Sequence, residues 1–457
     1  MTVHTFAARL GLDDMFRHIT HDFEVPAGTR SIIVEYDVKP FHPGIGPLTH
    51  QVSLSVDGPN GSRGAQHKLP WLDGTRRVIS ETWSSNGYTR GAIEPGTWTL
   101  SVDVFRIMPP GNTSYEVTVT LSDQAADGPA LPMPVLVANR GPGWYKGDLH
   151  GHTDHSDGNW TVAEFLQHAR NCGLDFVTIT DHNTTSGQPW AEALADDDLL
   201  VMCGIEVTTL FGHCLALGAR QWVDWRIKDG DTMTDRANAI MAAGHTFVIA
   251  HPMAEGHPWC AGCHWQFADV FPGPARLVEI WNGPWDPAKN ELGLRLFQVW
   301  LNSGVRMRAT AGTDIHGHQG PEVRVGYNRV WAEAFTEEAI LAGIRAGRNV
   351  LTYGPVLDLA LRSGPASAGV GEVLATGNAA ELVLNWADVP PGSRLTIFTG
   401  GDQGTEVRHE TPAEGAGSLP YGLGDLPPRN WVMATLRCYK GDMLAITNPV
   451  FVAGDWR

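Results

Sequence analysis

Histidine and aspartate are concentrated in one short stretch, GDLHGHTDHSDG at residues 147–158, which holds three of each. Across the whole chain, 12 of the 19 histidines lie between His150 and His318. Imidazole nitrogens and carboxylate oxygens are ligands for divalent Zn, Mn and Fe, and a carboxylate can bridge two ions. This stretch therefore predicts metal chemistry if other segments supply further ligands.

Other residues of the same types stand at or just after the ends of predicted strands. They are Asp181 and His182 in TITDHN, Glu206 in CGIEV, His213 in GHCLALG, His251 in FVIAHP, and Asp314 and His316 in TAGTDIHG. In α/β barrels and open sheets, the carboxyl ends of the strands are where active sites form. His150 and His152 are two residues apart, so an extended strand points both side chains to one face.

Each of these residues has an ordinary interpretation when it is taken alone. A single histidine is more often hydrogen-bonded in a core or loop than bound to metal, and Asp157 in SDG is typical of a turn. Six segments that deliver such residues to one edge are hard to explain in this way. The pattern as a whole predicts a metal site.

The elements that must position these residues divide the chain into three parts. Residues 1–140 show short alternating runs between Gly, Pro and Asn clusters, which predicts a β-sandwich. Residues 144–354 alternate apolar runs with helix-period segments, which predicts an α/β barrel or doubly wound sheet of parallel strands. Residues 355–457 return to strand patterns, and we expect a second small sandwich there.

One predicted helix, over residues 161–173, has clear end signals. Thr161 and Glu164 fit a capping box, and Gly173 fits a stop. The apolar residues inside it follow the helical spacing at Val162, Phe165, Leu166 and Ala169.

Composition narrows the possible functions. The chain has 457 residues, 42% hydrophobic and 18% charged, as in a globular protein. The net charge of −17 argues against a nucleic-acid surface, although bound cations would still permit an anionic substrate. No apolar run approaches the ~20 residues of a membrane span. Nothing in the sequence indicates an oligomeric state.

Six cysteines in a chain of this length do not form a disulfide framework, so we expect a reducing, cytoplasmic environment. The opening residues also lack the features of a secretory signal. CAGC at Cys260–Cys263 is half of a zinc ribbon, and we interpret it as a pair of loop thiols.

The motifs DLHGHTDHSDG, FVTITDHN, GIEVTTLFGH, IAHP and GTDIHG occur in the order typical of the PHP (polymerase and histidinol phosphatase) superfamily. The chain resembles that family over about residues 144–354. The flanking segments IEPGTWTLSV and AITNPVFVAG further resemble the branch that includes carbaryl hydrolase. The resemblance implies a distorted (β/α)7 barrel, flanked here by β-sandwich domains, with two or three divalent metal ions.

The resemblance also implies a distribution of ligands among the ions. One ion would be held by His150, His152, Glu206 and Asp314. A second ion would share Glu206 and add His213 and His251, and a third would be held by Asp157, His182 and His316. Two ions that share Glu206 would sit about 3.5–4 Å apart and bind a bridging hydroxide as the nucleophile. Because Ser186 and the thiols show no paired base, we expect no covalent intermediate.

Further residues are candidates for substrate contacts. His155 is a candidate general acid, and Asp181 would orient a ligand histidine. Arg324 and Arg329 would clamp a phosphate or else form surface ion pairs. The unassigned histidines are His257, His264 and His318. Tryptophans that would wall an aryl pocket, or simply pack in the core, are Trp259, Trp265, Trp281 and Trp285.

Three functions remain open. The first is a metal-dependent phosphoesterase, the commonest activity that the resemblance implies. The second is a carbamate or carboxyl aryl ester hydrolase, as the carbaryl-hydrolase resemblance implies. The third is a non-catalytic metal-binding or carbohydrate-binding protein, which the absence of a ligand would favour, and none is absent. We favour a small-molecule phosphoester as the substrate.

Overall fold

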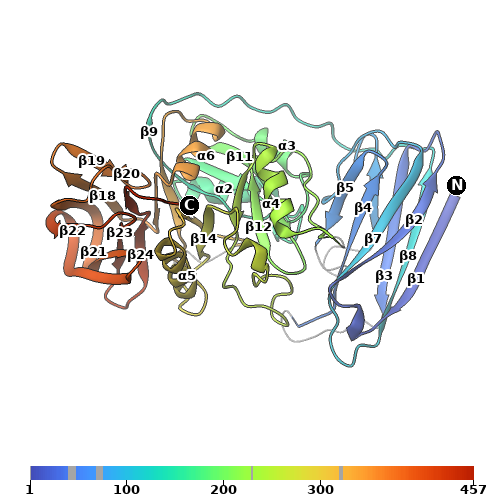
Figure 1. Cartoon of the computed structure of the whole chain (residues 1–457). Coiled ribbons are helices and arrows are strands. Elements are labelled where there is room, and N and C mark those ends of the chain that lie inside the picture. Colours follow the sequence, from blue (N-terminus) through green and yellow to red (C-terminus); the bar gives the residue numbers. More distant parts are fainter. Residues whose placement is uncertain (1, 40–47, 68–75, 228–229, 319–322) are drawn as a thin grey trace.

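The computed structural model describes residues 2–39, 48–67, 76–227, 230–318 and 323–457. Three regions follow one another along the long axis of the molecule (Figure 1). An all-β region at the N-terminus occupies one end, a mixed α/β region lies in the middle, and an all-β region at the C-terminus occupies the other end.

The N-terminal region contains two four-stranded antiparallel sheets. One has the order β1 (Thr2–Leu10), β8 (Thr113–Ser122), β3 (Ser31–Lys39) and β6 (Arg76–Ser80). The other has the order β2 (Arg17–Val25), β7 (Gly96–Arg106), β4 (Gln51–Gly58) and β5 (Gly61–Gln66). Side chains of both sheets, such as Val119 and Val102, are buried in one shared core. This arrangement follows from the alternating apolar residues, because every second side chain points to the same face. We call it the N-terminal sandwich.

The middle region carries the strands that lead to the candidate ligands. In chain order they are β9 (Gly143–Asp148), β10 (Phe176–Ile179), β11 (Leu200–Thr208), β12 (His213–Leu217), β13 (Thr246–Ile249), β14 (Leu277–Asn282), β15 (Arg308–Gly312) and β16 (Tyr327–Ala332). β9 pairs with both β10 and β16, so the sheet closes on itself. Helices alternate with many of these strands: α2 (Val162–Asn171), α3 (Gln188–Glu192), α4 (Met233–Ala242), α5 (Asn290–Asn302) and α6 (Glu337–Ala346).

The mixed α/β class is therefore confirmed, but a regular repeat of parallel β-α units is not formed by the described residues. β11 and β12 are antiparallel, β12 and β13 are antiparallel, and β16 runs antiparallel to β9. The expectation of parallel strands is wrong for β11 with β12 and for β12 with β13. Only four residues separate β11 from β12, and a parallel crossover needs about a dozen.

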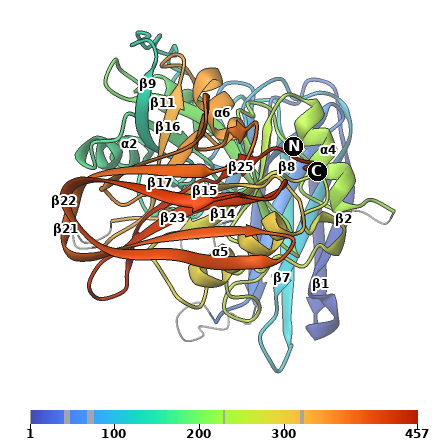
Figure 2. The same cartoon turned by 60° about the vertical axis from the view of Figure 1, so that its left-hand side comes forward.

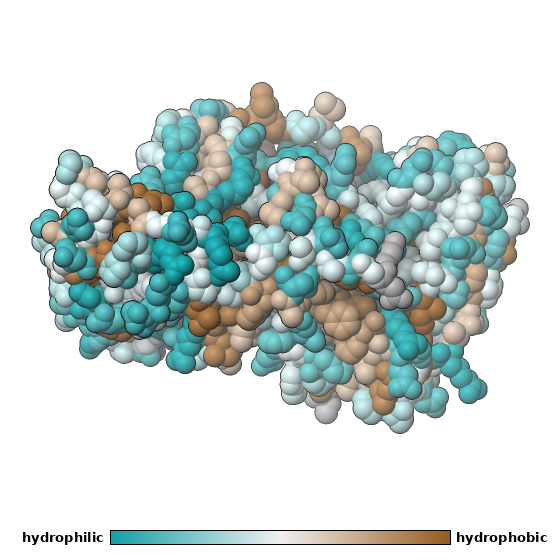
Figure 3. Space-filling model, viewed as in Figure 1, coloured by the Kyte–Doolittle hydropathy of each residue, from teal (hydrophilic) through white to brown (hydrophobic). Residues whose placement is uncertain are grey.

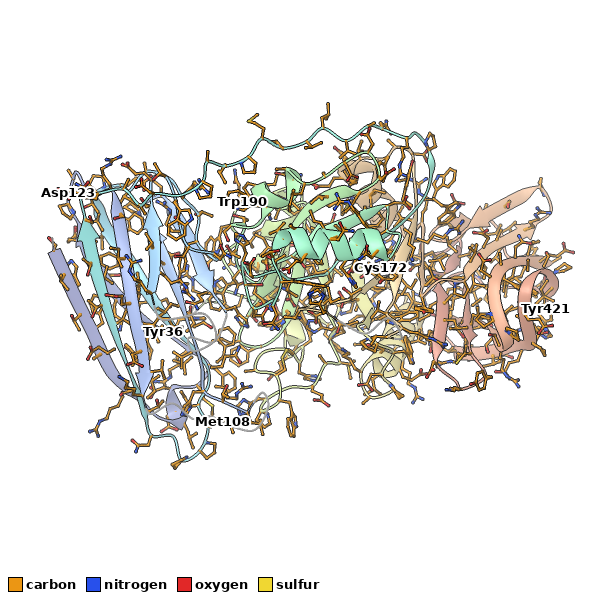
Figure 4. The ribbon with its side chains drawn as sticks, turned by 180° about the vertical axis from the view of Figure 1, so that it is seen from behind. Tyr36, Met108, Asp123, Cys172, Trp190 and Tyr421 are labelled. Carbon is orange, nitrogen blue, oxygen red and sulfur yellow. A yellow bond between two sulfur atoms is a disulfide. The ribbon has the colours of Figure 1, made fainter. Side chains whose placement is uncertain are left out.

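Helix α2 begins and ends where the sequence predicts. The Thr161 side chain accepts a hydrogen bond from the Glu164 backbone N–H, and the Glu164 carboxylate accepts one from the Thr161 N–H at 2.8 Å. Gly173 follows the last turn with a φ of 62°, which suits glycine. Figure 4, viewed from behind, shows α2 across the middle region, with Cys172 at its end.

The C-terminal region is all strand and is joined to the middle region by hydrogen bonds. Its strands are β17 (Asn349–Thr352), β18 (Val356–Ser363), β19 (Ala366–Gly369), β20 (Val373–Leu374), β21 (Ala380–Gly401), β22 (Gly404–Gly424), β23 (Trp431–Arg437), β24 (Met443–Thr447) and β25 (Val450–Val452). Figure 2 shows the long β21–β22 hairpin from its side. β17 pairs with β16 on one side and with β24 on the other. The expected boundary at residues 354 and 355 thus falls at a hydrogen-bonded junction.

Buried asparagines strengthen this junction. The Asn448 amide spans the strand end at Ala309, accepting its N–H at 2.7 Å and donating to its carbonyl at 2.9 Å. Asn448 also donates to the Asn349 side chain, which donates in turn to the Asn328 side chain. This network holds β15 directly before the segment that carries Asp314.

Polar and apolar residues are mixed over the face seen in Figure 3, and neither kind covers it. The connector between the sandwich and β9 runs along the top of Figure 1, and Met133 and Leu136 are strongly exposed on it. Within the described ranges, no helix is both long enough and apolar enough to cross a membrane.

The α2 cap yields a stability prediction. Thr161→Ala removes the side-chain acceptor for the Glu164 N–H and should lower the free energy of unfolding by about 1 kcal/mol. Urea denaturation followed by circular dichroism measures this change. A midpoint unchanged from that of the wild-type protein would contradict the role of the cap.

Candidate metal centre

The strand ends bring all nine predicted ligands into one cluster. The cluster contains three groups, and within each group the candidate ligand atoms lie within 4.8 Å of one another. The groups are His150, His152, Glu206 and Asp314; His152, Asp157, His182 and His316; and His182, Glu206 and His213. His251, from the end of β13, reaches the same Glu206 carboxylate at 3.1 Å. The nine candidate ligands, which come from six segments of the chain, therefore lie together.

Glu206 lies at the centre of the cluster and has no exposed side-chain surface. Five imidazoles surround its two carboxylate oxygens. The N–O distances are 3.3 Å for His150, 3.3 Å for His152, 2.8 Å for His182, 2.9 Å for His213 and 3.1 Å for His251. Burial alone would raise the pKa of Glu206, but these imidazoles hold the pKa well below its usual range. Glu206 is therefore an anion that can bridge two cations.

The close approaches in the cluster leave several ligand atoms without a hydrogen bond. Within the described part of the chain, the buried atoms with no hydrogen-bond partner include His150 Nε2, His152 Nδ1, Asp157 Oδ1, Glu206 Oε2, His213 Nε2 and His251 Nδ1. Unsatisfied buried polar atoms are costly and rare. Of these atoms, His150 Nε2 faces Glu206 Oε2 at 3.3 Å and Asp157 Oδ1 faces His316 Nε2 at 3.1 Å, and donors of this kind fit divalent cations held between them.

Two side chains at the rim complete a second part of the cluster. Asp157 Oδ1 lies 3.1 Å from His316 Nε2 and 3.4 Å from His182 Nε2. Burial would raise the pKa of Asp157, but His316 and His182 hold it well below its usual range. Asp157 therefore belongs to a different group from His150, and His152 belongs to both groups.

The backbone is strained at the ligands. His251 has a φ of 28°, Asp314 has a φ of 51°, and Asn183, next to His182, has a φ of 53°. Non-glycine residues seldom adopt these values, which cluster at functional sites when the surroundings enforce them. At Asn183 the enforcing contacts are visible, because its side chain accepts the Thr208 N–H at 2.9 Å and donates to the Thr208 carbonyl at 3.0 Å.

A chain of polar residues behind the ligands was missed by the sequence analysis. Glu279, buried in β14, accepts a hydrogen bond from His150 Nδ1 at 2.9 Å. Asn282 donates to both Glu279 and Asp314, and Lys289 donates to Asn282 at 2.6 Å. These bonds leave His150 Nε2 on the side of the ring that faces Glu206, where it could bind a metal ion. The only signal in the sequence is a carboxylate inside the apolar run RLVEIWNG.

Asp148 is a second buried carboxylate that the sequence analysis did not select. It accepts hydrogen bonds from the Thr313 hydroxyl and from the backbone N–H groups of Thr313 and His150. Burial raises its pKa to about 6 despite these bonds. Asp148 thereby ties the end of β9 to the segment before Asp314.

Asp181 and His155 lie beside the cluster rather than in it. Asp181 accepts from the Thr153 N–H at 2.8 Å, the Thr153 hydroxyl at 2.7 Å and the Ser156 hydroxyl at 2.6 Å. It thus orders the turn between His152 and Asp157 and shows no bond to a ligand histidine. His155 Nδ1 lies 2.8 Å from the Ser186 hydroxyl, so this serine has a histidine neighbour that the sequence spacing did not reveal.

His155 lines a different cavity, of about 520 Å³, between the N-terminal sandwich and the middle region. Trp190, labelled in Figure 4, lies on α3 in the wall of that cavity. A second cavity lies at the candidate ligands, and we call it the metal cavity. The three other unassigned histidines are not among the described residues that line it. His318 and His257 contact the rings of Trp160 and Phe16, respectively.

The two arginines predicted as phosphate clamps lie in ion pairs elsewhere. Arg324 is 4.0 Å from Asp442 and 44% exposed, and Arg329 is 2.9 Å from Asp358. Neither is among the described residues that line the metal cavity. The structure thus matches the alternative of surface ion pairs. Both residues follow the last ligand motif in sequence, but β16 carries Arg329 away from the cluster.

The metal cavity has a volume of about 310 Å³, and its wall includes residues from outside the ligand motifs. Gln51, His67 and Arg106 come from the N-terminal sandwich. Burial, followed by the neighbouring His182, lowers the pKa of His67 to about 3. Nothing in the spacing of these residues pointed to the metal site.

Trp259 also lines the cavity and is 53% exposed, whereas Trp265 and Trp281 are buried in the core and Trp285 packs against it. The prediction of loop thiols at Cys260 and Cys263 is wrong, because these residues form a disulfide. The turn brings their Cα atoms to 5.5 Å, a normal separation for a disulfide. Both cysteines line the metal cavity.

No family model matches the chain, and no curated protein matches it. Several solved structures are similar to parts of it, including the following three. A two-domain protein from Bacteroides vulgatus, described as containing a predicted PHP-like metal-dependent phosphoesterase, is 13% identical with a TM-score of 0.39, over 71% of this chain and 100% of that one.

An amidohydrolase from Chromobacterium violaceum, with bound sulfate and no metal, is 17% identical with a TM-score of 0.29, over 39% of this chain and 89% of that one. A metal-dependent phosphoesterase from Bifidobacterium adolescentis is 19% identical with a TM-score of 0.29, over 43% of this chain and 94% of that one. Similarity this low assigns no function to this chain.

The hydrogen bond between Glu279 and His150 predicts that a substitution at Glu279, which is not itself a candidate ligand, weakens metal binding. Glu279→Gln removes the charged acceptor behind His150 and should weaken binding of Mn²⁺ or Zn²⁺ about 10–100-fold. Titration of the metal-free protein, followed by calorimetry, measures this change. Glu338→Gln, on the solvent-exposed first turn of α6, is the control, and equal affinity in both variants would contradict the prediction.

The raised pKa of His316 predicts how pH affects the stability of the metal-free protein. Burial would lower the pKa of His316, but Asp157 raises it to about 9, above the ~6.5 of an unfolded chain. Protonated His316 therefore stabilises the folded protein. This stabilisation is complete below about pH 6.5 and is lost as the pH rises through about 9. The melting temperature of the metal-free protein should therefore fall over this range.

Added metal should reverse that trend, because cations compete with protons for the imidazoles and bind more tightly at higher pH. The rise in melting temperature on adding Mn²⁺ should thus grow between about pH 6.5 and 9. Differential scanning fluorimetry measures both curves. A metal-free melting temperature that rises over this range would contradict the assignment of His316 to the cluster.

Proposed function

We propose that this protein is a metal-dependent hydrolase of the PHP type that cleaves a small-molecule ester, with a phosphoester as the favoured substrate. The observation that carries the proposal is the Glu206 carboxylate, buried among five imidazoles and next to a cavity. A purely structural ion site is closed, whereas catalytic sites keep an open position. The adjoining cavity of about 310 Å³ supplies that opening.

Two or three divalent ions would be held by the three groups of ligands. Glu206 belongs to two of these groups, as do His152 and His182, so neighbouring ions would share ligands. Because the donors are imidazoles and carboxylates, we propose Zn, Mn or Fe. When bound, such ions supply Lewis acidity and activate water for attack at neutral pH.

The protein's own residues set the geometry for this chemistry. Glu279 orients His150, and Asp181 orders the turn that separates His152 from Asp157. Asn282 donates to Asp314 at 3.1 Å and fixes the orientation of its carboxylate. These contacts preorganise the ligands, so little reorganisation is needed when substrate binds.

The cavity wall favours an anionic ester. Arg106 lines the wall with a guanidinium group whose Nε and Nη1 donate to backbone carbonyls, and its positive charge would attract a phosphoryl group. Arg324 and Arg329 lie in ion pairs outside the cavity, so we propose no phosphate contact for them. His155 lines another cavity, so we propose no acid role for it.

A carbamate or carboxyl aryl ester is the second candidate, and Trp259 favours it. This half-exposed indole lines the cavity and offers an apolar face to an aryl group. The flanking segments that resemble the carbaryl-hydrolase branch point to the same substrate class. An aryl phosphate would use both Arg106 and Trp259, so the two candidates differ in the reacting group rather than in the leaving group.

An assay with three substrates tests the proposal. With Mn²⁺ or Zn²⁺ bound, the protein should hydrolyse p-nitrophenyl phosphate or bis-p-nitrophenyl phosphate, lose this activity with a chelator, and leave 1-naphthyl N-methylcarbamate intact. His152→Ala should lower metal content and kcat/KM by more than the ~100-fold expected for an outer contact. Circular dichroism should show that the variant stays folded.

Arg324→Ala and Arg329→Ala serve as matched controls and should retain wild-type kcat/KM. Cleavage of the carbamate alone would establish the second candidate instead. A fully metallated and active His152→Ala variant would contradict the ligand assignment.

A further inference from the structure

We propose that His67, a residue of the N-terminal sandwich, is a substrate-positioning residue of the metal site. It would donate an N–H group to an anionic oxygen of the ligand held in the cavity. The proposal rests on the proposed function in one respect, that the cavity binds an oxyanion next to metal ions. It assigns to the sandwich a direct part in substrate recognition.

His67 follows β5 and lies directly over the candidate ligands. Its ring centroid is 4.4 Å from that of His182, and on another side the ring packs edge-on against Phe105 at 5.1 Å. The residue is only 8% exposed and lines the metal cavity. Burying a polar ring this deeply costs folding free energy unless its nitrogens form hydrogen bonds to the protein or to a ligand.

The hydrogen bonding of His67 leaves one nitrogen available to a ligand. The Gln51 side-chain nitrogen lies 3.2 Å from His67 Nε2. Because an amide nitrogen only donates, Nε2 accepts, and a neutral ring then carries its proton on Nδ1. In the described ranges, no protein group bonds to that nitrogen. His67 therefore offers an N–H donor and no lone pair on the Nδ1 side.

Contacts between the sandwich and the middle region hold this donor in place. Arg106 donates from Nε to the Thr49 carbonyl at 2.7 Å and from Nη1 to the Pro258 carbonyl at 2.8 Å, so it joins β7 to the loop that carries Trp259. The Gly87 N–H donates to the Ser186 hydroxyl at 3.0 Å, and the Gly87 carbonyl accepts from Thr184 at 2.8 Å.

A buried ion pair adds to these backbone contacts. Arg226 Nη2 lies 2.6 Å from Asp57 of β4, and the arginine side chain is only 6% exposed. The position of His67 relative to Glu206 is therefore set by several independent contacts. A rigidly held donor discriminates between ligands better than a mobile one.

The surroundings of His67 define the class of ligand. The cavity combines a neutral N–H donor, the Gln51 amide and the Arg106 guanidinium on the sandwich side with the carboxylate and imidazole cluster on the other side. Donors opposite bound cations suit a tetrahedral oxyanion, which has oxygens to present in both directions. Phosphate is the simplest molecule with this chemistry.

Inorganic phosphate is the probe for the test. The full-length protein, loaded with Mn²⁺, is titrated with phosphate by calorimetry, and its metal content is measured by mass spectrometry. His67→Phe keeps a packed ring and removes the N–H, and it should weaken phosphate binding about tenfold or more. Metal content should stay at the wild-type value.

His67→Asn is the rescue variant, because its side-chain amide nitrogen takes nearly the position of Nδ1. It should recover most of the phosphate affinity. His21→Phe is the control, since His21 lies in the sandwich, stacks on Phe6 and bonds to the Tyr115 hydroxyl, outside the residues that line the cavity. It should bind phosphate as the wild-type protein does.

Several outcomes would overturn the proposal. These are unchanged phosphate affinity in a fully metallated His67→Phe variant, a loss of metal that would make His67 a ligand, or an absence of phosphate binding to the metallated wild-type protein. If His67→Phe does not fold, as judged by thermal unfolding, Gln51→Leu gives the same comparison by removing the group that fixes the tautomer.

The proposed function and this proposal fail in different ways. Phosphate binding that depends on His67, together with no turnover of any of the three esters, would support the role of His67 and contradict the hydrolase. Turnover of a phosphoester with equal KM and kcat in wild type and His67→Phe would support the hydrolase and contradict the role of His67.

Discussion

The structure of the middle region depends on one buried charge. Glu206 has no exposed side-chain surface and is surrounded by five imidazoles from four other segments. An isolated carboxylate in such a position would be strongly destabilising, and it is tolerated only when positive partners are close. Three features place those partners. They are the ends of the strands, the left-handed backbone at His251 and Asp314, and the hydrogen bonds of Asn183.

The two β regions have different relations to this centre. The C-terminal strands extend the central sheet through β17 and β24, and the Asn448 network holds β15 before Asp314. They therefore support the site from behind. The N-terminal sandwich lies across the mouth of the cavity and contributes Gln51, His67 and Arg106 to its wall. The C-terminal region supports the candidate ligands, and the N-terminal sandwich forms part of the cavity wall.

Much of this could be predicted from sequence because the ligands occur in short motifs at strand ends. The pair His150 and His152, and the cap at Thr161, depend on local spacing alone. Glu279 and His67 could not be found in that way. Glu279 is a single carboxylate inside an apolar run, and His67 reaches the site only through the docking of a separate sandwich.

Other expectations failed where tertiary contacts decide the outcome. Arg324 and Arg329 follow the last ligand motif, but the C-terminal region provides acidic partners for them in Asp442 and Asp358. The β11–β12 hairpin departs from a parallel barrel because its connection is too short. The Cys260–Cys263 pairing depends on the conformation of one turn, which composition does not determine.

The most direct test of the account is the number of metal ions bound per chain, measured by native mass spectrometry on the Mn²⁺-loaded wild-type protein and on Glu206→Gln. The account predicts two or three ions in the wild-type protein and at most one in the folded variant, because one carboxylate serves neighbouring ions. Equal metal content in both proteins, or no bound metal in a folded wild-type chain, would contradict it.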